Sequence, residues 1–304
     1  MRIAVTGASG FIGGAVATAL ADADHEVVGF GRTAGGWSHP RARYRYWDLD
    51  SGILRADRDF EAVVHCAALA DDWAPIADAL RANRGGTRTV VRTFPHSRIV
   101  HLSTASVYDA FVPNIDVPES AAPVRRFLST YSESKTLAEF ELAGTDAVIL
   151  RPHAVYGPGD TTLLPRLLAG VRRRRAVLPE GANVRHSLTH IDNLVQAVVR
   201  ALEPGTPRGT YNVADDQPVL LSDVLREIFA RRGMPVRIAS IPYRAAFSLA
   251  ASLETAARLR RRRPRLTRYA VSQLGLERTL DLTAARTRLG YDPFATTLAG
   301  AENW

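Results

Sequence analysis

Tyr131 and Lys135 are the residues whose types and spacing most directly suggest chemistry, and Lys135 is the only lysine among 39 lysines and arginines. They stand four apart in YSESKTLAEFEL, a helical pattern that places both side chains on one face, a turn apart. The pKa of an isolated tyrosine is about 10, and a nearby ammonium lowers it by favouring the phenolate. We therefore expect Tyr131 to exchange a proton with a substrate and Lys135 to assist it. The alternative is a solvated helix lysine.

Two hydroxyls follow SRIVHLS, a segment with the pattern of a buried strand. In LSTASVY, Thr104 and Ser106 could hydrogen-bond an oxygen of a substrate, and Thr104 could stabilise negative charge that develops there. The alternative is that both residues only cap the end of the strand. The presence of the Tyr131/Lys135 pair favours substrate binding.

Three glycines, Gly7, Gly10 and Gly13, lie in TGASGFIGG between the first apolar run, RIAV, and a helical pattern. Glycine permits the backbone angles of a tight turn, and the lack of a side chain lets a pyrophosphate approach the free N–H groups of the following helix. Because the triplet stands between a predicted strand and a predicted helix, it predicts dinucleotide binding.

The end of the second predicted strand bears on the choice of cofactor. EVVGF is followed by Gly31-Arg32, where NAD-binding folds usually carry an acid that accepts hydrogen bonds from the ribose. A guanidinium suits a 2′-phosphate instead, so we expect NADP(H), with NAD(H) as the alternative. Asp48, in WDLD, could accept from the adenine amino group, although Asp50 lies close by.

Short β-branched runs alternate with helical patterns up to about residue 160, and this order predicts a doubly wound α/β fold of Rossmann type with a parallel sheet. GTYNVAD reads as a later strand that returns to this sheet. We expect a dinucleotide-binding domain over 1–160 and about 191–215. Residues 161–190 and 216–304 would form a smaller, mostly helical substrate-binding lobe, with the ligand site in between.

The net charge of +8 and the pI of about 10.1 raise the question of nucleic-acid binding. Arginines are spread along the whole chain without an aromatic-interleaved basic patch, so we expect no nucleic-acid partner and no metal site. The basic amphipathic segment near 244–263 could touch an anionic membrane, but it suits packing on its own domain equally well. The single cysteine, Cys66, fits a reducing compartment, and we expect a cytoplasmic protein.

Six motifs occur in order: TGASGFIGG, HCAALA, STASVY, YSESK, RPHAVYGPGD and HIDNLVQAV. As a set they resemble those of extended short-chain dehydrogenases/reductases, the NAD(P)-dependent epimerase/dehydratase family. The resemblance implies Thr104, Tyr131 and Lys135 as catalytic residues and a homodimer built through the helix that carries Tyr131. The expected cofactor contacts are Gly7, Ser9, Gly10, Phe11, Ile12, Gly13, Arg32, Asp48, Leu49, Ala67, Tyr131, Lys135, Pro152 and Val155.

Departures from the family pattern narrow the expected activity. Sugar-nucleotide dehydratases of this family carry an acidic pair where this chain has Ala105 and Ser106, so dehydration is not expected. The C-terminal segments RPRLTRYAVSQLG and ARTRLGYDP are similar to the branch of 3β-hydroxysteroid dehydrogenases and β-keto reductases. Arg185 keeps a nucleotide-sugar epimerase or reductase open as the alternative, because related enzymes often bind a diphosphate there.

These observations together predict an NAD(P)(H)-dependent oxidoreductase that transfers hydride to or from the carbonyl or secondary alcohol of a small-molecule metabolite. The expected substrate contacts are Thr104, Ser106 and Arg185. A non-catalytic dinucleotide sensor is a second alternative. Such proteins usually lose the Tyr/Lys pair that this chain retains.

Overall fold

A computed structural model describes residues 1–55, 58–161 and 163–304, and its centre is a seven-stranded parallel sheet. The strand order is β12-β7-β5-β4-β1-β2-β3, so the direction of winding reverses between β1 and β4. The strands are β1 (Arg2–Thr6), β2 (Glu26–Gly31), β3 (Arg43–Tyr46), β4 (Ala62–His65), β5 (Arg98–Leu102), β7 (Ala147–Pro152) and β12 (Gly209–Val213). The Rossmann-type fold is confirmed, and the strand predicted in GTYNVAD pairs with β7 at the edge of the sheet.

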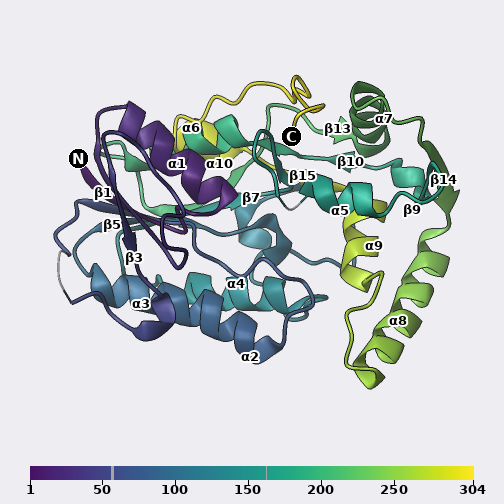
Figure 1. The fold of residues 1–304 in the computed structure, drawn as a ribbon, viewed down its shortest axis with the longest axis horizontal. Helices are drawn as coiled ribbons and strands as arrows, with labels where there is room; N and C mark the ends of the chain where they lie inside the picture. The colour runs from purple at the N-terminus through teal and green to yellow at the C-terminus, as the bar shows by residue number, and fades with distance from the viewer. Residues whose placement is uncertain (56–57, 162) are drawn as a thin grey trace.

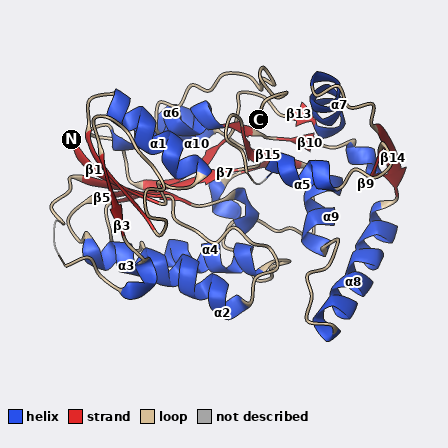
Figure 2. Ribbon diagram, viewed as in Figure 1, coloured by secondary structure: helices blue, strands red, loops and turns tan. Residues whose placement is uncertain are grey.

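Helices cover both faces of this sheet because its strands are apolar on both sides. Figure 1 shows one layer above the sheet and another below it, and Figure 2 shows the strands between them. The upper layer shares one large core with the sheet and comprises α1 (Phe11–Asp22), α6 (Ile191–Leu202) and α10 (Thr283–Arg288). The lower layer comprises α2 (Ile76–Ala79), a π-helical segment η2 (Leu80–Gly85), α3 (Gly86–Thr93) and α4 (Thr130–Phe140).

The remaining helices and strands lie mostly on the right of the molecule in Figure 1, beyond the large sheet and its two helical layers. Four short strands form a second sheet, ordered β13-β10-β15-β6, and two further pairs are β8 with β11 and β9 with β14. Their bounds are β6 (Asn114–Val117), β8 (Val155–Tyr156), β9 (Arg175–Pro179), β10 (Arg185–His186), β11 (Thr189–His190), β13 (Val219–Leu220), β14 (Arg237–Ile241) and β15 (Arg278–Leu280). The helices are α5 (Leu163–Ala169), α7 (Leu221–Arg231), α8 (Tyr243–Leu259) and α9 (Arg268–Gly275), and the short 3₁₀ turns are η1 (Leu49–Ser51), η3 (Ala105–Val107), η4 (Glu119–Ala121) and η5 (Glu180–Ala182).

Two segments pack across the predicted boundary between the parts of the chain. β6, at 114–117, pairs with β15 from the C-terminal region. Conversely, Ala285 of α10 and the following Leu289 and Tyr291 belong to the core of the large sheet. The substrate-binding lobe over 161–190 and 216–304 therefore remains a prediction, and β6 and α10 pack across its expected bounds.

The basic segment near 244–263 is largely the helix α8, which projects from the body of the protein in Figure 1. Its Ala246 and Ala250 pack with Val271 of α9, as expected for a helix that packs on its own domain. Leu259 at its end is 82% exposed. Within the described ranges, no helix is both long enough and apolar enough to cross a membrane.

A buried ion pair attaches α4 to the sheet. Arg151 of β7 is 4% exposed, and its guanidinium donates to Glu139 of α4 through Nη2 at 2.7 Å and Nε at 3.0 Å. The same guanidinium donates to the Tyr108 hydroxyl and the Glu119 carbonyl, while Ser103 donates to Glu139. Removing one partner would leave the other charge buried without compensation.

Arg151→Leu should therefore lower the free energy of unfolding by about 3–5 kcal/mol. Arg226→Leu, which removes an exposed pair with Asp223 on α7, should change it by less than about 1 kcal/mol. Urea unfolding followed by circular dichroism measures both variants. Equal changes in the two would contradict the structural role of the Arg151–Glu139 pair.

Four of the buried histidines resist protonation. Burial lowers the pKa of His65 and of His153 to about 3, and it holds the pKa of His101 and of His186 well below the usual value. The unfolded chain protonates its histidines below about pH 6.5, whereas folded His65 and His153 stay neutral until about pH 3. Stability therefore falls as the pH decreases through this window.

Between pH 6.5 and pH 5 the free energy of unfolding should decrease by about 1 kcal/mol per pH unit for each of these histidines. The carboxylates contribute at lower pH, since the pKa of Glu141 is held at about 2 by Arg88 and Arg84. Urea titrations at both pH values test this expectation. A stability that stays constant across the window would contradict neutral buried histidines.

Candidate active site

The first turn of α4 positions Tyr131. The Ser129 hydroxyl caps the helix by accepting from the Ser132 N–H at 3.1 Å, and the Thr130 hydroxyl donates to the Ala74 carbonyl. One turn later the Asn83 amide of η2 donates to the Ser134 hydroxyl at 2.8 Å. These bonds fix the helix predicted from YSESK against its neighbours.

Thr104 meets Tyr131 at the end of β5. Burial and the nearby Tyr269 hold the pKa of Tyr131 above its usual value, while the adjacent Thr104 side chain opposes this rise. Thr104 also caps η3, because its hydroxyl accepts from the Ser106 N–H at 3.1 Å. The capping role considered from the sequence is thus present together with the contact to Tyr131.

Ser106 extends this contact to a residue that sequence reasoning missed. Thr104 Oγ1 donates to Ser106 Oγ at 3.1 Å, and Ser106 Oγ lies 2.6 Å from the hydroxyl of Tyr269 in α9. Tyr269 stands in RPRLTRYAVSQLG, a segment that resembles a family branch without singling out this tyrosine. The sequence carries no local signal for the Tyr269 contact, because 163 residues separate the two partners.

Lys135 lies under Tyr131 but is turned toward the sheet. It is 2% exposed, and its Nζ donates to the Leu102 carbonyl at 2.6 Å and lies 3.3 Å from His101 Nε2. Burial lowers the pKa of Lys135 to about 8, so the ammonium stays mostly charged at neutral pH. This differs from the expectation that Lys135 would lower the pKa of Tyr131, because the ammonium is bound to the strand end and burial controls the phenol.

Neutral groups surround the ammonium. His65 Nδ1 bonds to the Thr6 hydroxyl at 2.7 Å and its Nε2 bonds to the Thr87 hydroxyl at 3.1 Å. Burial and the charge of Lys135 keep His65 unprotonated. Burial also raises the pKa of the Cys66 thiol to about 12, so the thiol is not a nucleophile at neutral pH.

The glycine turn fits a dinucleotide pyrophosphate. Gly7 has φ +73°, and a Cβ there would lie 2.7 Å from the Ala67 nitrogen, while a Cβ on Gly13 would overlap the Gly7 carbonyl. α1 begins after Gly10 without any side-chain cap, so the N–H groups of its first turn are available to an anion. Ser9 and Gly10 are exposed at this turn. Ala67 lies beside the turn at the end of β4, where its N–H donates to Thr6 at 3.4 Å.

Arg32 and Asp48 lie where an adenosine would be expected. Arg32 is exposed directly after β2, and Asp48 caps η1 by accepting from the Asp50 N–H at 3.1 Å. Asp50 instead pairs with Arg81 at 3.1 Å, which favours Asp48 as the adenine acceptor. Leu49 packs near Gly86 of α3.

The other predicted contacts are more scattered. Pro152 ends β7, and Val155 begins β8, where it pairs with Thr189 of β11. Ile12 packs against the main core, whereas Phe11 faces a groove. Arg185 is exposed and donates to the Pro218 carbonyl at 3.0 Å, so it is not part of the hydrogen-bonded group around Tyr131.

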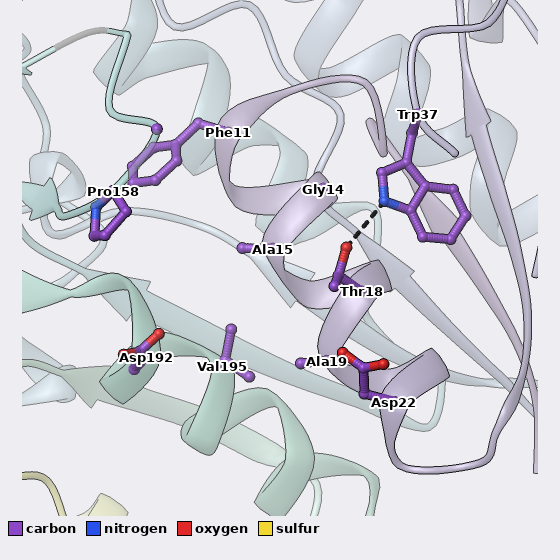
Figure 3. A pocket seen from close by; sticks show the side chains of 11 residues that line it. Phe11, Gly14, Ala15, Thr18, Ala19, Asp22, Trp37, Pro158, Asp192 and Val195 are labelled. Carbon is purple, nitrogen blue, oxygen red and sulfur yellow. Dashed lines mark hydrogen bonds between the residues drawn. The ribbon is translucent and has the colours of Figure 1, made fainter. Parts of the chain in front are cut away.

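The groove beside Phe11 has a volume of about 450 Å³ and runs between α1, α6 and the loop at Pro158. In Figure 3 the Trp37 indole closes one side and donates from Nε1 to the Thr18 hydroxyl, at 3.1 Å. Neither Tyr131 nor Lys135 lines this groove, so it is separate from the Tyr131–Thr104 site.

Comparison with known proteins identifies the family. The NAD dependent epimerase/dehydratase family matches residues 3–214. A 2-alkyl-3-oxoalkanoate reductase of Shewanella oneidensis is 31% identical over 94% of this chain and 81% of its own length. The 4-hydroxy-2-methyl-3-oxo-4-farnesyl-3,4-dihydroquinoline-1-oxide ketoreductase of Stigmatella aurantiaca is 31% identical over 96% of this chain and 92% of its own length.

Among solved structures, UDP-glucuronic acid 4-epimerase from Bacillus cereus in complex with NAD superposes with a TM-score of 0.74 over 99% of this chain and 96% of that chain. Its sequence identity is 21%, so the likeness concerns the fold. The family match covers most of the chain and includes the glycine turn, the STASVY turn and the YSESK helix. This chain therefore belongs to the NAD dependent epimerase/dehydratase family, the extended short-chain dehydrogenases/reductases that its motifs resemble.

Proposed function

We propose that this protein is an NADP(H)-dependent reductase of 3-oxoacyl compounds. The observation that carries the proposal is the position of the Tyr131 phenol beside the Thr104 side chain, with the Lys135 ammonium one turn away. The protein is an NAD(P)-dependent oxidoreductase, and the relatives named as a 2-alkyl-3-oxoalkanoate reductase and a ketoreductase support a ketone as the substrate.

Tyr131 is suited to donate a proton in the direction of reduction. The phenol is protonated at neutral pH, as a tyrosine with the ordinary pKa of about 10 also is, and it can donate to the oxygen of a ketone. The Thr104 hydroxyl, which lies beside the same phenol, would donate a second hydrogen bond to that oxygen and stabilise the negative charge that develops there. A bound nicotinamide supplies the hydride to the carbonyl carbon.

The chain's own residues provide places for each part of the dinucleotide. The turn at Gly7, Gly10 and Gly13 and the start of α1 would hold the pyrophosphate. Arg32 would bind a 2′-phosphate and Asp48 the adenine amino group. Lys135 would hold the nicotinamide ribose through its ammonium, which burial leaves mostly charged at neutral pH.

The homodimer implied by the family resemblance is also a proposal. Phe140 at the end of α4 is 54% exposed and Ile76 at the start of α2 is 39% exposed, and these two helices pack together. A second copy that packs against α4 would cover such apolar side chains.

Tyr131→Phe should lower kcat by about 10²–10⁴-fold, because the substitution removes the proton donor and keeps the ring. The measurement is NADPH oxidation with a 2-alkyl-3-oxo ester, together with NADPH affinity from fluorescence titration, which should stay unchanged. Tyr243→Phe on α8 is the matched control. Activity of Tyr131→Phe within a few-fold of wild type would refute the assignment.

Arg32→Ala should weaken NADPH binding by about 10-fold or more, since a charge-assisted bond to phosphate is worth about 1.5–3 kcal/mol. NADH affinity should change little. Arg43→Ala, an exposed arginine at the start of β3 and thus at the opposite end of the sheet, is the control. Equal weakening of both cofactors would discard the role of Arg32 in reading the 2′-phosphate.

A further inference from the structure

The active-site turn receives a second phenol from a distant part of the chain. Tyr269 lies in the first turn of α9, and its hydroxyl is 2.6 Å from Ser106 Oγ. Burial raises the pKa of Tyr269, as it raises that of Tyr131, so both phenols are protonated at neutral pH. The site therefore holds two tyrosines that can donate hydrogen bonds.

A single ketone oxygen does not use all the donors at this turn. The hydroxyls form a series in which Thr104, beside the Tyr131 phenol, donates to Ser106 at 3.1 Å, and Ser106 lies 2.6 Å from the Tyr269 hydroxyl. A carbonyl oxygen has two lone pairs, which Tyr131 and Thr104 would fill. Ser106 and Tyr269 then remain as donors a short distance from the reacting group.

Several contacts hold Tyr269 in this place. Two residues earlier, the Thr267 hydroxyl caps α9 and donates to Asp72 at 2.9 Å. Arg263 pairs with the same Asp72 at 2.9 Å and also with Asp71, in the loop after β4. The C-terminal side of α9 is also fixed, because Arg278 donates to the Ser272 hydroxyl at 2.6 Å. Because α9 is held at both ends, the phenol of Tyr269 is preorganised for binding.

We propose that Tyr269 binds a second oxygen of the substrate, the acyl oxygen two carbons away from the ketone carbon in a 3-oxoacyl group. This inference rests on the proposed function, because it assumes that the ketone is reduced at Tyr131. Tyr269 together with Ser106 then makes the enzyme prefer 3-oxoacyl compounds over simple ketones. A ketone without the second oxygen leaves Tyr269 bonded only to Ser106.

The test compares a 3-oxo ester with a simple ketone of the same chain length. Tyr269→Phe should lower kcat/KM for the 3-oxo ester by about 10–100-fold, mainly through KM, because a lost hydrogen bond in a buried site is worth about 1–3 kcal/mol. For the simple ketone the change should stay below about threefold. The pH dependence of kcat, which reports Tyr131, should move only toward lower pH, because Tyr269 is one of the groups that hold the pKa of Tyr131 above its usual value.

Tyr243→Phe serves as the matched control, since the Tyr243 side chain packs with Phe247 of α8 away from the hydroxyl series. A second measurement avoids turnover: calorimetric binding of the 3-hydroxy ester in the presence of NADP⁺ should weaken in Tyr269→Phe and not in Tyr243→Phe. The thermal midpoint of each variant shows that it is folded.

The outcomes separate the two proposals. A wild-type protein that reduces neither compound contradicts the proposed function itself. If the wild type reduces both compounds, an equal loss on both in Tyr269→Phe would show that Tyr269 acts only through Ser106 and Thr104, and would overturn the inference. No loss on either compound would overturn it as well.

Discussion

The attachment of α4 to the carboxyl end of β5 is the constraint on which the rest of the site depends. Lys135 Nζ donates to the Leu102 carbonyl, and one turn further along α4 Glu139 accepts from Ser103 and from the buried Arg151. The bonds to Leu102 and Ser103 join the helix to the strand end that continues into Thr104, and the bond to Arg151 joins it to the neighbouring strand β7. Tyr131 and Thr104 meet because their elements are fixed to each other by charges kept out of water.

This arrangement gives the Lys135 ammonium one structural hydrogen bond, and the proposed function would add a second. The bond to Leu102 organises the protein, whereas the proposed bond to a ribose would organise the cofactor. A lysine ammonium has three donors, so both bonds are compatible with its chemistry. The neutral state of His65 and His101 removes competing positive charge from this region. Burial thus keeps His65 and His101 neutral and keeps the Tyr131 phenol protonated.

The parts of the site that were predictable from the sequence are local. Gly7, Gly10 and Gly13 lie within one turn between a strand and a helix, and Tyr131 and Lys135 share one helix, so spacing alone indicated their geometry. The direction of the Lys135 side chain was not predictable, because it is set by a carbonyl 33 residues earlier in the chain. Short strands such as β10 and β13 were missed because two residues carry no periodic signal. Tyr269 was missed because only the tertiary fold brings it to Ser106.

The pairing of β6 with β15 means that part of the fold can form only after the C-terminal region has been synthesised. The segment that follows Ser106 continues into β6, and β6 pairs with β15 at 278–280. Asp72, in the loop after β4, bonds to Arg263 and Thr267. A growing polypeptide on the ribosome can close the glycine turn and the first strands early. It cannot place Tyr269 beside Ser106 or complete the sheet around the STASVY turn until nearly the entire chain has emerged, so a message truncated before α9 encodes a chain that lacks Tyr269 and the β15 partner of β6.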